Sequence, residues 1–151
     1  MRRGDRELSE AEALDILARA EWGVLATVDL DGWPYAIPMN HALLDGGLIL
    51  HSAPSGHKLD NLAGEAKVSY CVVTAAEALP LELSTRYESA VVFGRARILA
   101  EPGEKAAALR ALGLRFAPGH PELVERELAK NFARTAALRI EIERVTGKAR
   151  R

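Results

Sequence analysis

The sequence has a single cysteine, Cys71, among its 151 residues. A disulfide within the chain needs two cysteines, so no internal cross-link holds this fold together, and a reducing compartment suits such a protein. We interpret Cys71 as a small buried side chain on a strand rather than as a reactive thiol. The shortage of cysteine therefore predicts a cytoplasmic protein that depends on its hydrophobic core.

The sequence also lacks long hydrophobic runs and an excess of either charge. No uninterrupted apolar stretch approaches the ~20 residues of a membrane-spanning helix, and no apolar export segment follows the charged residues 1–7. The 20 Lys and Arg residues nearly balance the 21 Asp and Glu residues, whereas a protein that coats nucleic acid needs a basic surplus. We expect neither a membrane nor nucleic acid as a partner.

Several motifs of common catalytic domains are missing as well. No GxGxxG follows an expected strand and no GxxxxGK[ST] is present, which argues against dinucleotide-binding and P-loop domains. The GxSxG motif of serine hydrolases is also missing. The histidines have no thiol or carboxylate neighbours at the spacing of a zinc site, so we expect no metal.

The overall amino-acid composition is that of one globular domain. Hydrophobic residues make up 48% of the chain and charged residues 27%, which is inside the range of folded proteins. The length matches one domain. We therefore treat residues 1–151 as a single domain.

Alternating apolar residues and turn signals predict the elements of this domain. Ser9 and Glu12 have the spacing of a capping box, which predicts a helix over residues 9–20. Further helices are expected at residues 57–62, 103–112 and 121–132, and strands at residues 22–28, 33–44, 48–52, 68–73, 90–99 and 139–145. Within residues 33–44, Pro34 and Pro38 imply an edge, a bulge or a break, because each removes a backbone donor. Gly94 marks a bulge or a close approach of two strands. The remaining segments are interpreted as a solvated arm at residues 2–7, a loop with room for a short helix at 75–85, and a basic tail at 148–151.

The order of these elements predicts the fold class. Five strands follow one another at short spacing, and two helices and a closing strand come after them. This order lacks the alternating βαβ pattern of a parallel sheet. It predicts a mainly β (α+β) domain, an antiparallel barrel with helices at its margins.

The stretch after the strand at residues 48–52 is the best candidate for a ligand site. Ser52 ends the strand, Gly56 frees the backbone, and His57 and Lys58 begin a helical turn. Backbone N–H groups at a helix start, a lysine and a hydroxyl can together bind a phosphate. The same residues also fit a polar loop with a solvated lysine, and composition alone favours that simpler interpretation.

Four short motifs carry a family resemblance. In chain order they are Gly23-Val24-Leu25-Ala26-Thr27-Val28, Asp31-Gly32-Trp33-Pro34-Tyr35-Ala36-Ile37-Pro38-Met39-Asn40, Leu50-His51-Ser52-Ala53 and Gly56-His57-Lys58. This order resembles the FMN-binding split β-barrel proteins related to pyridoxamine phosphate oxidase, and within them it is most similar to the nitroimidazole-resistance branch. No single motif is specific, so the resemblance depends on order and spacing over nearly the whole chain.

The resemblance implies an antiparallel split β-barrel with flanking helices and FMN as cofactor. The residues beside the isoalloxazine ring would be Ile37, Pro38, Met39 and Asn40. Those along the ring and ribityl chain would be His51, Ser52 and Ala53, and those at the phosphate would be His57 and Lys58. Without the resemblance, Met39 would be interpreted as core filler and Asn40 as a polar strand residue.

The resemblance also implies a homodimer with each flavin held between two subunits, and a small-molecule substrate. Ser89 and Lys148 are the residues expected to reach the flavin of the partner subunit. A domain of this size needs a second chain to cover a planar tricyclic ring.

Two departures from the oxidase point away from vitamin oxidation. The chain ends without the oxidase's Trp- and Arg-bearing C-terminal motif, and His57 stands where the oxidase has Arg. We therefore expect an FMN-dependent oxidoreductase, a reductase of nitroimidazole-like or other electron-poor compounds. His51 is the candidate catalytic residue, as proton donor or stacking partner, and a structural histidine is the alternative. A flavin, haem or deazaflavin binding protein without turnover is the other hypothesis for the chain.

Overall fold

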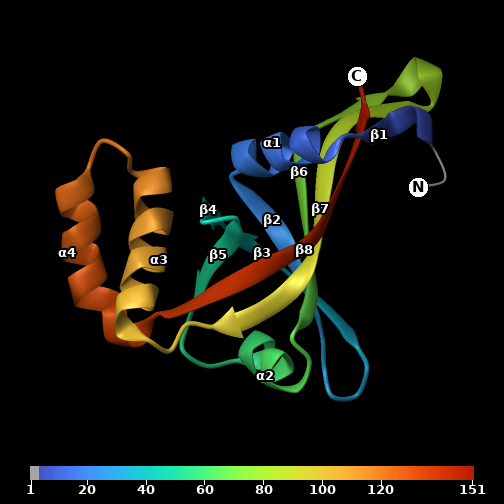
Figure 1. Cartoon of the computed structure of the whole chain (residues 1–151). Helices are drawn as coiled ribbons and strands as arrows, with labels where there is room; N and C mark the ends of the chain where they lie inside the picture. Colours follow the sequence, from blue (N-terminus) through green and yellow to red (C-terminus); the bar gives the residue numbers. More distant parts are fainter. Residues whose placement is uncertain (1–3) are drawn as a thin grey trace.

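The computed structural model describes residues 4–151 and contains one antiparallel sheet of eight strands. The strands are β1 (Glu7–Leu8), β2 (Trp22–Val28), β3 (Pro34–Asn40), β4 (Ala42–Leu44), β5 (Gly47–Ser52), β6 (Lys67–Leu79), β7 (Ser84–Ile98) and β8 (Ala136–Arg150). Their order is β3-β2-β6-β7-β8-β5-β4, and β1 pairs with β8. The sheet curls into a half-barrel (Figure 1), which confirms the predicted antiparallel split β-barrel.

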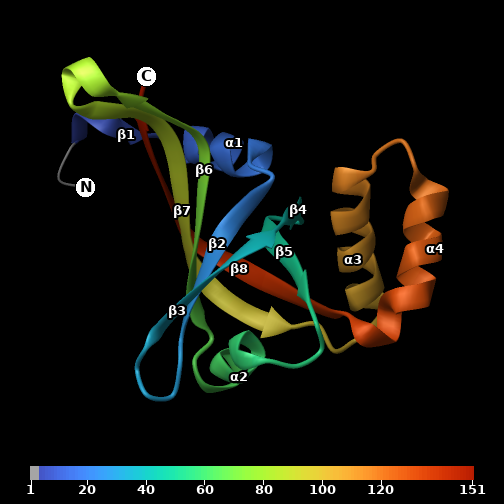
Figure 2. The same cartoon turned by 180° about the vertical axis from the view of Figure 1, so that it is seen from behind.

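Four α-helices flank this sheet in the described part of the chain. They are α1 (Glu10–Arg19), α2 (His57–Gly64), α3 (Pro102–Phe116) and α4 (Pro121–Asn131). The capping box that starts α1 is formed as predicted, since the Ser9 hydroxyl accepts from the Glu12 N–H and the Glu12 carboxylate accepts from the Ser9 N–H. The antiparallel pair α3 and α4, here called the α3–α4 hairpin, stands to one side of the barrel, with α4 outermost (Figure 2). Among residues 4–151, no helix is both long and apolar enough to cross a membrane.

The loop expected at residues 75–85 is for the most part strand, and only the short helix expected within it is present. Strands β6 and β7 continue through this segment as a long hairpin, paired as far as Leu79 and Ser84, with a short 3₁₀ turn at Pro80–Glu82. An ion pair of 2.5 Å between Arg86 and Glu77 joins the two strands. Residues 75–85 lack a clear alternation of apolar and polar residues because this hairpin projects from the barrel and does not need a buried apolar face.

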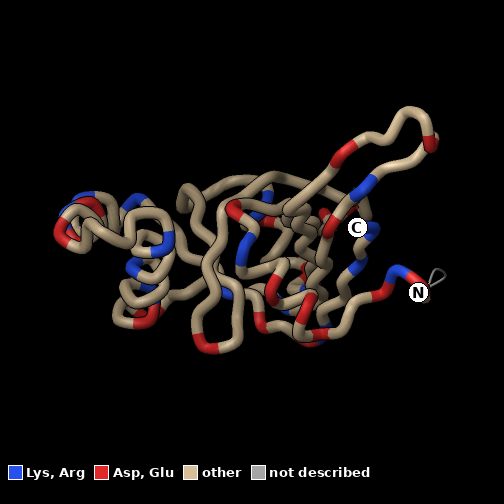
Figure 3. The backbone as a smooth tube through the Cα atoms, turned by 90° about the horizontal axis from the view of Figure 1, so that it is seen from above, with Lys and Arg blue, Asp and Glu red and all other residues tan. Residues whose placement is uncertain are grey.

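The expectation of a basic tail at residues 148–151 is also wrong. Strand β8 extends to Arg150, where its basic side chains alternate with the buried Gly147 and Ala149. β8 pairs with β7 along this stretch, and Glu7 and Leu8 pair with Lys148 and Gly147. The predicted N-terminal arm is therefore in part a strand, and its first residues, Arg2 and Arg3, lie outside the described residues. Acidic and basic positions are interspersed over the barrel and the helices (Figure 3).

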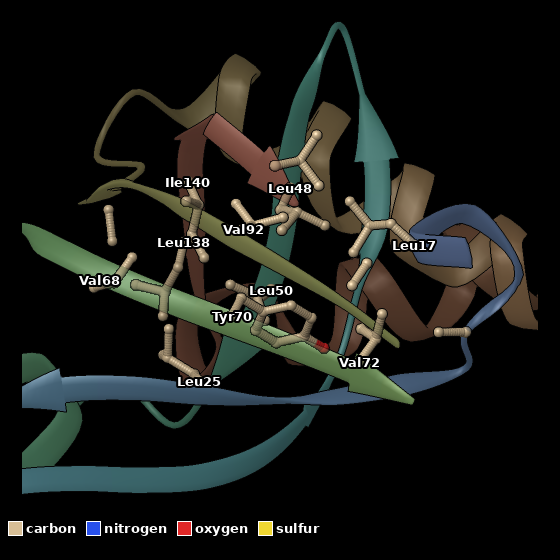
Figure 4. Close-up of a cluster of buried hydrophobic side chains, with 14 of the residues drawn as sticks. Leu17, Leu25, Leu48, Leu50, Val68, Tyr70, Val72, Val92, Leu138 and Ile140 are labelled. Atoms are coloured by element: carbon tan, nitrogen blue, oxygen red, sulfur yellow. The ribbon is translucent and has the colours of Figure 1, made fainter. Parts of the chain in front are cut away.

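The core fills the concave side of the sheet. Tyr70 of β6 is fully buried among Leu25, Leu50 and Val72 (Figure 4), and α1 closes the cluster with Ile16 and other apolar residues. Burying a side chain of this size contributes roughly 1.5–3 kcal/mol, so the core supplies most of the favourable free energy of folding.

The single strand expected at residues 33–44 is divided at His41. The chain leaves β3, which pairs with β2 at one end of the sheet, and enters β4, which pairs with β5 at the other end. His41 is fully buried at this bend. Because β3 and β4 belong to opposite ends of the sheet, the bend at His41 is the point where the barrel closes.

Buried hydrogen bonds hold the bend at His41 in place. The His41 Nε2 lies 2.8 Å from the Leu17 carbonyl oxygen, which only accepts, so Nε2 carries the proton. The Tyr70 hydroxyl donates to the Met39 carbonyl at 2.6 Å and lies 3.0 Å from His41 Nδ1. Burial lowers the pKa of His41 and raises the pKa of Tyr70, so both groups are neutral at pH 7.

Gly94 forms the close approach that the sequence predicts. The pairing of β7 with β8 shifts register between Phe93 and Gly94. A Cβ atom at position 94 would overlap the carbonyl oxygen of Glu141 on β8, which is backbone and cannot rotate away.

Gly94→Ala is therefore expected to destabilise the protein by about 2 kcal/mol or more, because β7 and β8 must separate to admit the methyl group. Urea denaturation followed by circular dichroism measures the change. Gly119→Ala is the matched control, since a Cβ there meets no atom within 4 Å. Equal stability of the two variants would show that β7 and β8 do not approach closely at Gly94.

His41→Gln is expected to reduce the dependence of stability on pH. The folded protein holds His41 with a lowered pKa, whereas the unfolded chain protonates it near pH 6.5. Its contribution to stability is therefore complete above pH 6.5 and is lost as the pH falls from there toward the folded pKa. Urea denaturation at pH 7.5, 6.5 and 5.5 should show a smaller loss for the variant than for the wild type.

The variant is not expected to abolish this dependence, because burial lowers the pKa of His51 as well. His120→Gln is the control, since His120 is exposed at the start of α4. A wild type whose stability is constant over this range would contradict the role given to His41.

Candidate functional site

A cavity of about 350 Å³ lies beside the bend at His41, between β3 and β5. These two strands approach each other without pairing, and the cavity occupies the split between them. Its lining residues are Tyr35, Ile37, Pro38, Met39, Asn40, His51, Ser52 and Lys58. The fold thus brings β3 together with the segment of β5 and α2, which in the sequence are linked only through the family resemblance.

The β3 wall of the cavity combines apolar side chains with backbone polar groups. Ile37 and Met39 are half-buried and pack against the core. β3 is the edge strand of the sheet and pairs only with β2, so the N–H and C=O groups on its other side have no strand partner. Proline is confined to such edges because it lacks an N–H, which accounts for Pro34 and Pro38 in this strand.

The start of α2 forms the cationic end of the cavity. Lys58 lines the cavity and makes no ion pair with any residue in the part of the chain that the structure describes. Gly56, the N-cap of α2, has φ +129°, a conformation that favours glycine, and its missing side chain leaves the first N–H groups of the helix uncapped. A helix start with free N–H groups and an unpaired lysine is suited to an anion.

Two predicted residues near α2 do not line the cavity. The ring of His57 lies 4.6 Å from that of Tyr35, and its Nε2 is 3.8 Å from the Asp29 carboxylate. His57 thus holds α2 against the hairpin of β2 and β3. Ala53 follows β5 and is exposed.

Ser89 and Lys148 are also outside the lining. They face each other as cross-strand partners on β7 and β8, and the Ser89 hydroxyl donates to the Lys148 carbonyl at 3.4 Å. The Lys148 ammonium lies 5.8 Å from the centre of the Tyr87 ring. Within one chain, the structure does not bring these two residues to the cavity of β3 and β5.

Tyr35 lines the cavity but is not among the site residues predicted from the sequence. The signal was available, because alternation along a strand puts Tyr35 on the same face as Ile37 and Met39. Its pairing with His57 could not be seen in the sequence, since it depends on how α2 packs.

His51 is the titratable side chain that faces the cavity from β5. The residue is exposed, and the neighbouring protein desolvates its imidazole in part, which lowers its pKa and favours the neutral ring at pH 7. No hydrogen bond to another described residue involves this ring, in contrast to His41. A neutral, unpaired imidazole at the wall of a cavity can donate or accept a proton, or stack on a flat ligand.

Two other polar side chains of the lining, Asn40 and Ser52, have hydrogen-bond partners. The Asn40 amide donates to the Glu21 carbonyl at 2.9 Å, and the Ser52 hydroxyl donates to the Ala53 carbonyl at 2.7 Å. No group of three or more His, Cys, Asp or Glu side chains within residues 4–151 is arranged to hold a metal ion. The cavity therefore suits a largely flat organic ligand with an anionic end.

Solved structures with the same fold include several cofactor-binding proteins. The FAD and heme binding protein from Mycobacterium smegmatis is 28% identical, with a TM-score of 0.79 over 95% of this chain and 73% of its own. A FAD-binding protein from Mesorhizobium loti is 26% identical, with a TM-score of 0.65 over 97% of this chain and 98% of its own.

A candidate 5-nitroimidazole antibiotic resistance protein from Bacteroides thetaiotaomicron shares the fold. It is 22% identical, with a TM-score of 0.77 over 94% of this chain and 85% of its own. A comparison with curated proteins gave no significant match. The profile of the pyridoxamine 5'-phosphate oxidase family matches residues 9–149, nearly the whole chain. The chain is therefore a member of the pyridoxamine 5'-phosphate oxidase family.

Proposed function

We propose that this protein binds FMN in the split between β3 and β5 and uses it to reduce small electron-poor compounds. The observation that carries the proposal is the composition of one cavity. Seven of the residues that the family resemblance assigns to the flavin line it together: Ile37, Pro38, Met39, Asn40, His51, Ser52 and Lys58.

The β3 wall fits an isoalloxazine ring. The ring has apolar faces and a polar edge with donors and acceptors. Ile37 and Met39 offer apolar surface, and the free backbone groups of the edge strand offer the matching hydrogen bonds. The hydrogen bond from Tyr70 to the Met39 carbonyl keeps this wall rigid.

The α2 end fits the phosphate. A dianionic phosphate needs fixed donors and at least one cation, which the uncapped start of α2 and the unpaired Lys58 supply. The His57 side chain would contribute to phosphate binding indirectly, because it packs on Tyr35 and so fixes the position of α2. The approach of its Nε2 to the Asp29 carboxylate, at 3.8 Å, argues against a contact between its side chain and the phosphate.

When bound, the flavin supplies the redox chemistry, accepting and releasing electrons with protons. The protein orients the ring, limits access of water and holds a proton donor or acceptor near it. His51 is the side chain suited to this last role, because its neutral imidazole faces the cavity and has no hydrogen-bond partner among the described residues. A structural role for His51 is harder to support without such a partner.

A homodimer is part of the same proposal. Ser89 and Lys148 do not line the cavity of their own chain, so any contact with a flavin would be with that of the partner. The split is also open toward solvent on the side away from the core, and a second subunit would cover the ring there.

The comparisons bear on the substrate class and on a flavin or haem as ligand, whereas FMN as the particular flavin depends on the family resemblance. Similarity to a candidate 5-nitroimidazole resistance protein supports nitroaromatic compounds as substrates. The alternative is a carrier or sensor of flavin, haem or deazaflavin without turnover, which the Mycobacterium smegmatis protein that binds FAD and heme supports.

Turnover distinguishes the two functions. Protein loaded with FMN is expected to be yellow, to be reduced by a nicotinamide donor and to be reoxidised by a nitroimidazole faster than free FMN. Stopped-flow absorbance near the flavin maximum measures both rates. Binding of FMN with neither rate above that of free FMN would reject the enzyme hypothesis and leave the carrier hypothesis.

Lys58→Ala is expected to weaken FMN binding by about 1.5–3 kcal/mol, the scale of a hydrogen bond to a charged group. This corresponds to roughly a tenfold to hundredfold rise in Kd, measured by quenching of flavin fluorescence. Lys130→Ala, at an exposed position of α4, is the control and should leave the Kd unchanged. An unchanged Kd for Lys58→Ala would show that the phosphate binds elsewhere.

A further inference from the structure

A second cavity, of about 320 Å³, lies between the α3–α4 hairpin and the end of β5. Its lining is apolar for the most part and comes from both helices and the segment after them, with Leu112, Phe116, Leu123 and Phe132 among the apolar side chains. His51 lines this cavity as well as the split between β3 and β5.

The α3–α4 hairpin is built in a way that keeps this cavity open. The helices approach closely at Gly113, where a Cβ would lie 2.6 Å from Val124 Cγ1. At the base, Lys105 of α3 lies over the Phe132 ring at 4.3 Å and donates to the Phe132 carbonyl at 2.7 Å. The two helices are thus joined beside the turn that connects them, at Gly113 and Val124, and at the opposite end, at Lys105 and Phe132. Two apolar side chains of the cavity lining remain exposed, Phe116 at 47% and Leu123 at 39%.

The polar groups of this cavity indicate which ligand would fit. On the α4 side, the Asn131 amide donates to the Glu127 carboxylate at 3.1 Å and accepts from Arg134 at 2.8 Å, so these groups satisfy one another. The Thr135 hydroxyl donates to the Asn131 carbonyl at 3.0 Å. His51 is left as the polar side chain of the lining that has no hydrogen-bond partner in the described chain.

The charge of the lining and the volume of the cavity restrict which ligands can bind. The lining includes no lysine or arginine, and Glu127 would repel an anion. The volume is at the lower end of the roughly 300–1,000 Å³ of ligand pockets in proteins, which suits one or two rings rather than a porphyrin.

We propose that the cavity of the α3–α4 hairpin binds an uncharged, mostly apolar ring compound with one hydrogen-bonding group directed at His51. The site is separate from the split of β3 and β5, and binding there does not require the flavin. Because the two cavities share His51, a ligand held in the hairpin has its polar group next to the proposed flavin site.

Isothermal titration with 1-naphthol, which is uncharged at pH 7, tests the proposal directly. The full chain is expected to bind one molecule, with or without saturating FMN, and to bind the anion 1-naphthoate much more weakly. Leu123→Gln makes the wall polar at a half-exposed position and should weaken 1-naphthol binding roughly fivefold to tenfold. Phe116→Gln, at a second half-exposed wall position, should act in the same direction.

Leu81→Gln is the matched control, because Leu81 is fully exposed at the tip of the hairpin of β6 and β7. His51→Phe keeps a ring and removes the hydrogen bond, so it should also weaken 1-naphthol. Failure of the wild type to bind, or equal affinity of Leu123→Gln and Leu81→Gln, would overturn the proposal. So would sedimentation showing that Leu123→Gln breaks a dimer without changing 1-naphthol affinity, because the apolar surface would then be an interface.

These outcomes are independent of the proposed flavin function. Binding of 1-naphthol without binding of FMN would retain the hairpin site and reject the flavin. Binding of FMN without 1-naphthol would do the reverse.

Discussion

The bend at His41 is the constraint on which the rest of the structure depends. It lets one run of sequence serve as both ends of the sheet, β3 pairing with β2 and β4 pairing with β5. The buried imidazole holds this bend to α1 through the Leu17 carbonyl, and Tyr70 holds the adjacent Met39 carbonyl. Without these bonds the polar backbone at the bend would be buried and unpaired, at a cost of about 1–3 kcal/mol for each group.

The candidate site follows from this closure. Beyond the bend, β3 and β5 diverge, and the free edge of β3 faces a cavity instead of another strand. A row of unpaired backbone groups is a liability in most sheets, since it can pair with other chains. Here the same groups offer a flat ligand a fixed set of donors and acceptors, and the prolines of β3 limit unwanted pairing.

Much of the fold could be predicted from the sequence, because local signals and tertiary structure agree. The capping box at Ser9, the strand at residues 22–28 and the close approach at Gly94 all depend on neighbours in sequence or on the absence of a side chain. The long hairpin of β6 and β7 and the extension of β8 could not, because those strands are held by pairing partners with little apolar burial. Pro34 and Pro38 indicated an edge, a bulge or a break in residues 33–44, but not that the chain bends at His41, where the imidazole bonds to the Leu17 carbonyl of α1.

The positions of the candidate residues could be predicted from the sequence only in part, for physical reasons. Both faces of β3 contribute to the cavity, because β3 is an edge strand and the cavity lies along its free edge, so consecutive residues from Ile37 to Asn40 line it. His57 turns toward Tyr35 and Asp29 because of how α2 packs, which no local pattern encodes. The second cavity depends on the spacing of two helices around Gly113, and the sequence showed only that two helices were present.

The most direct measurement is a crystal structure of the protein grown with FMN. We expect the isoalloxazine ring between β3 and β5, with its edge on the β3 backbone near Met39 and its phosphate at Lys58 and the first turn of α2. Electron density for the flavin at any other position, or a split filled by side chains in crystals soaked to saturation, would contradict this account.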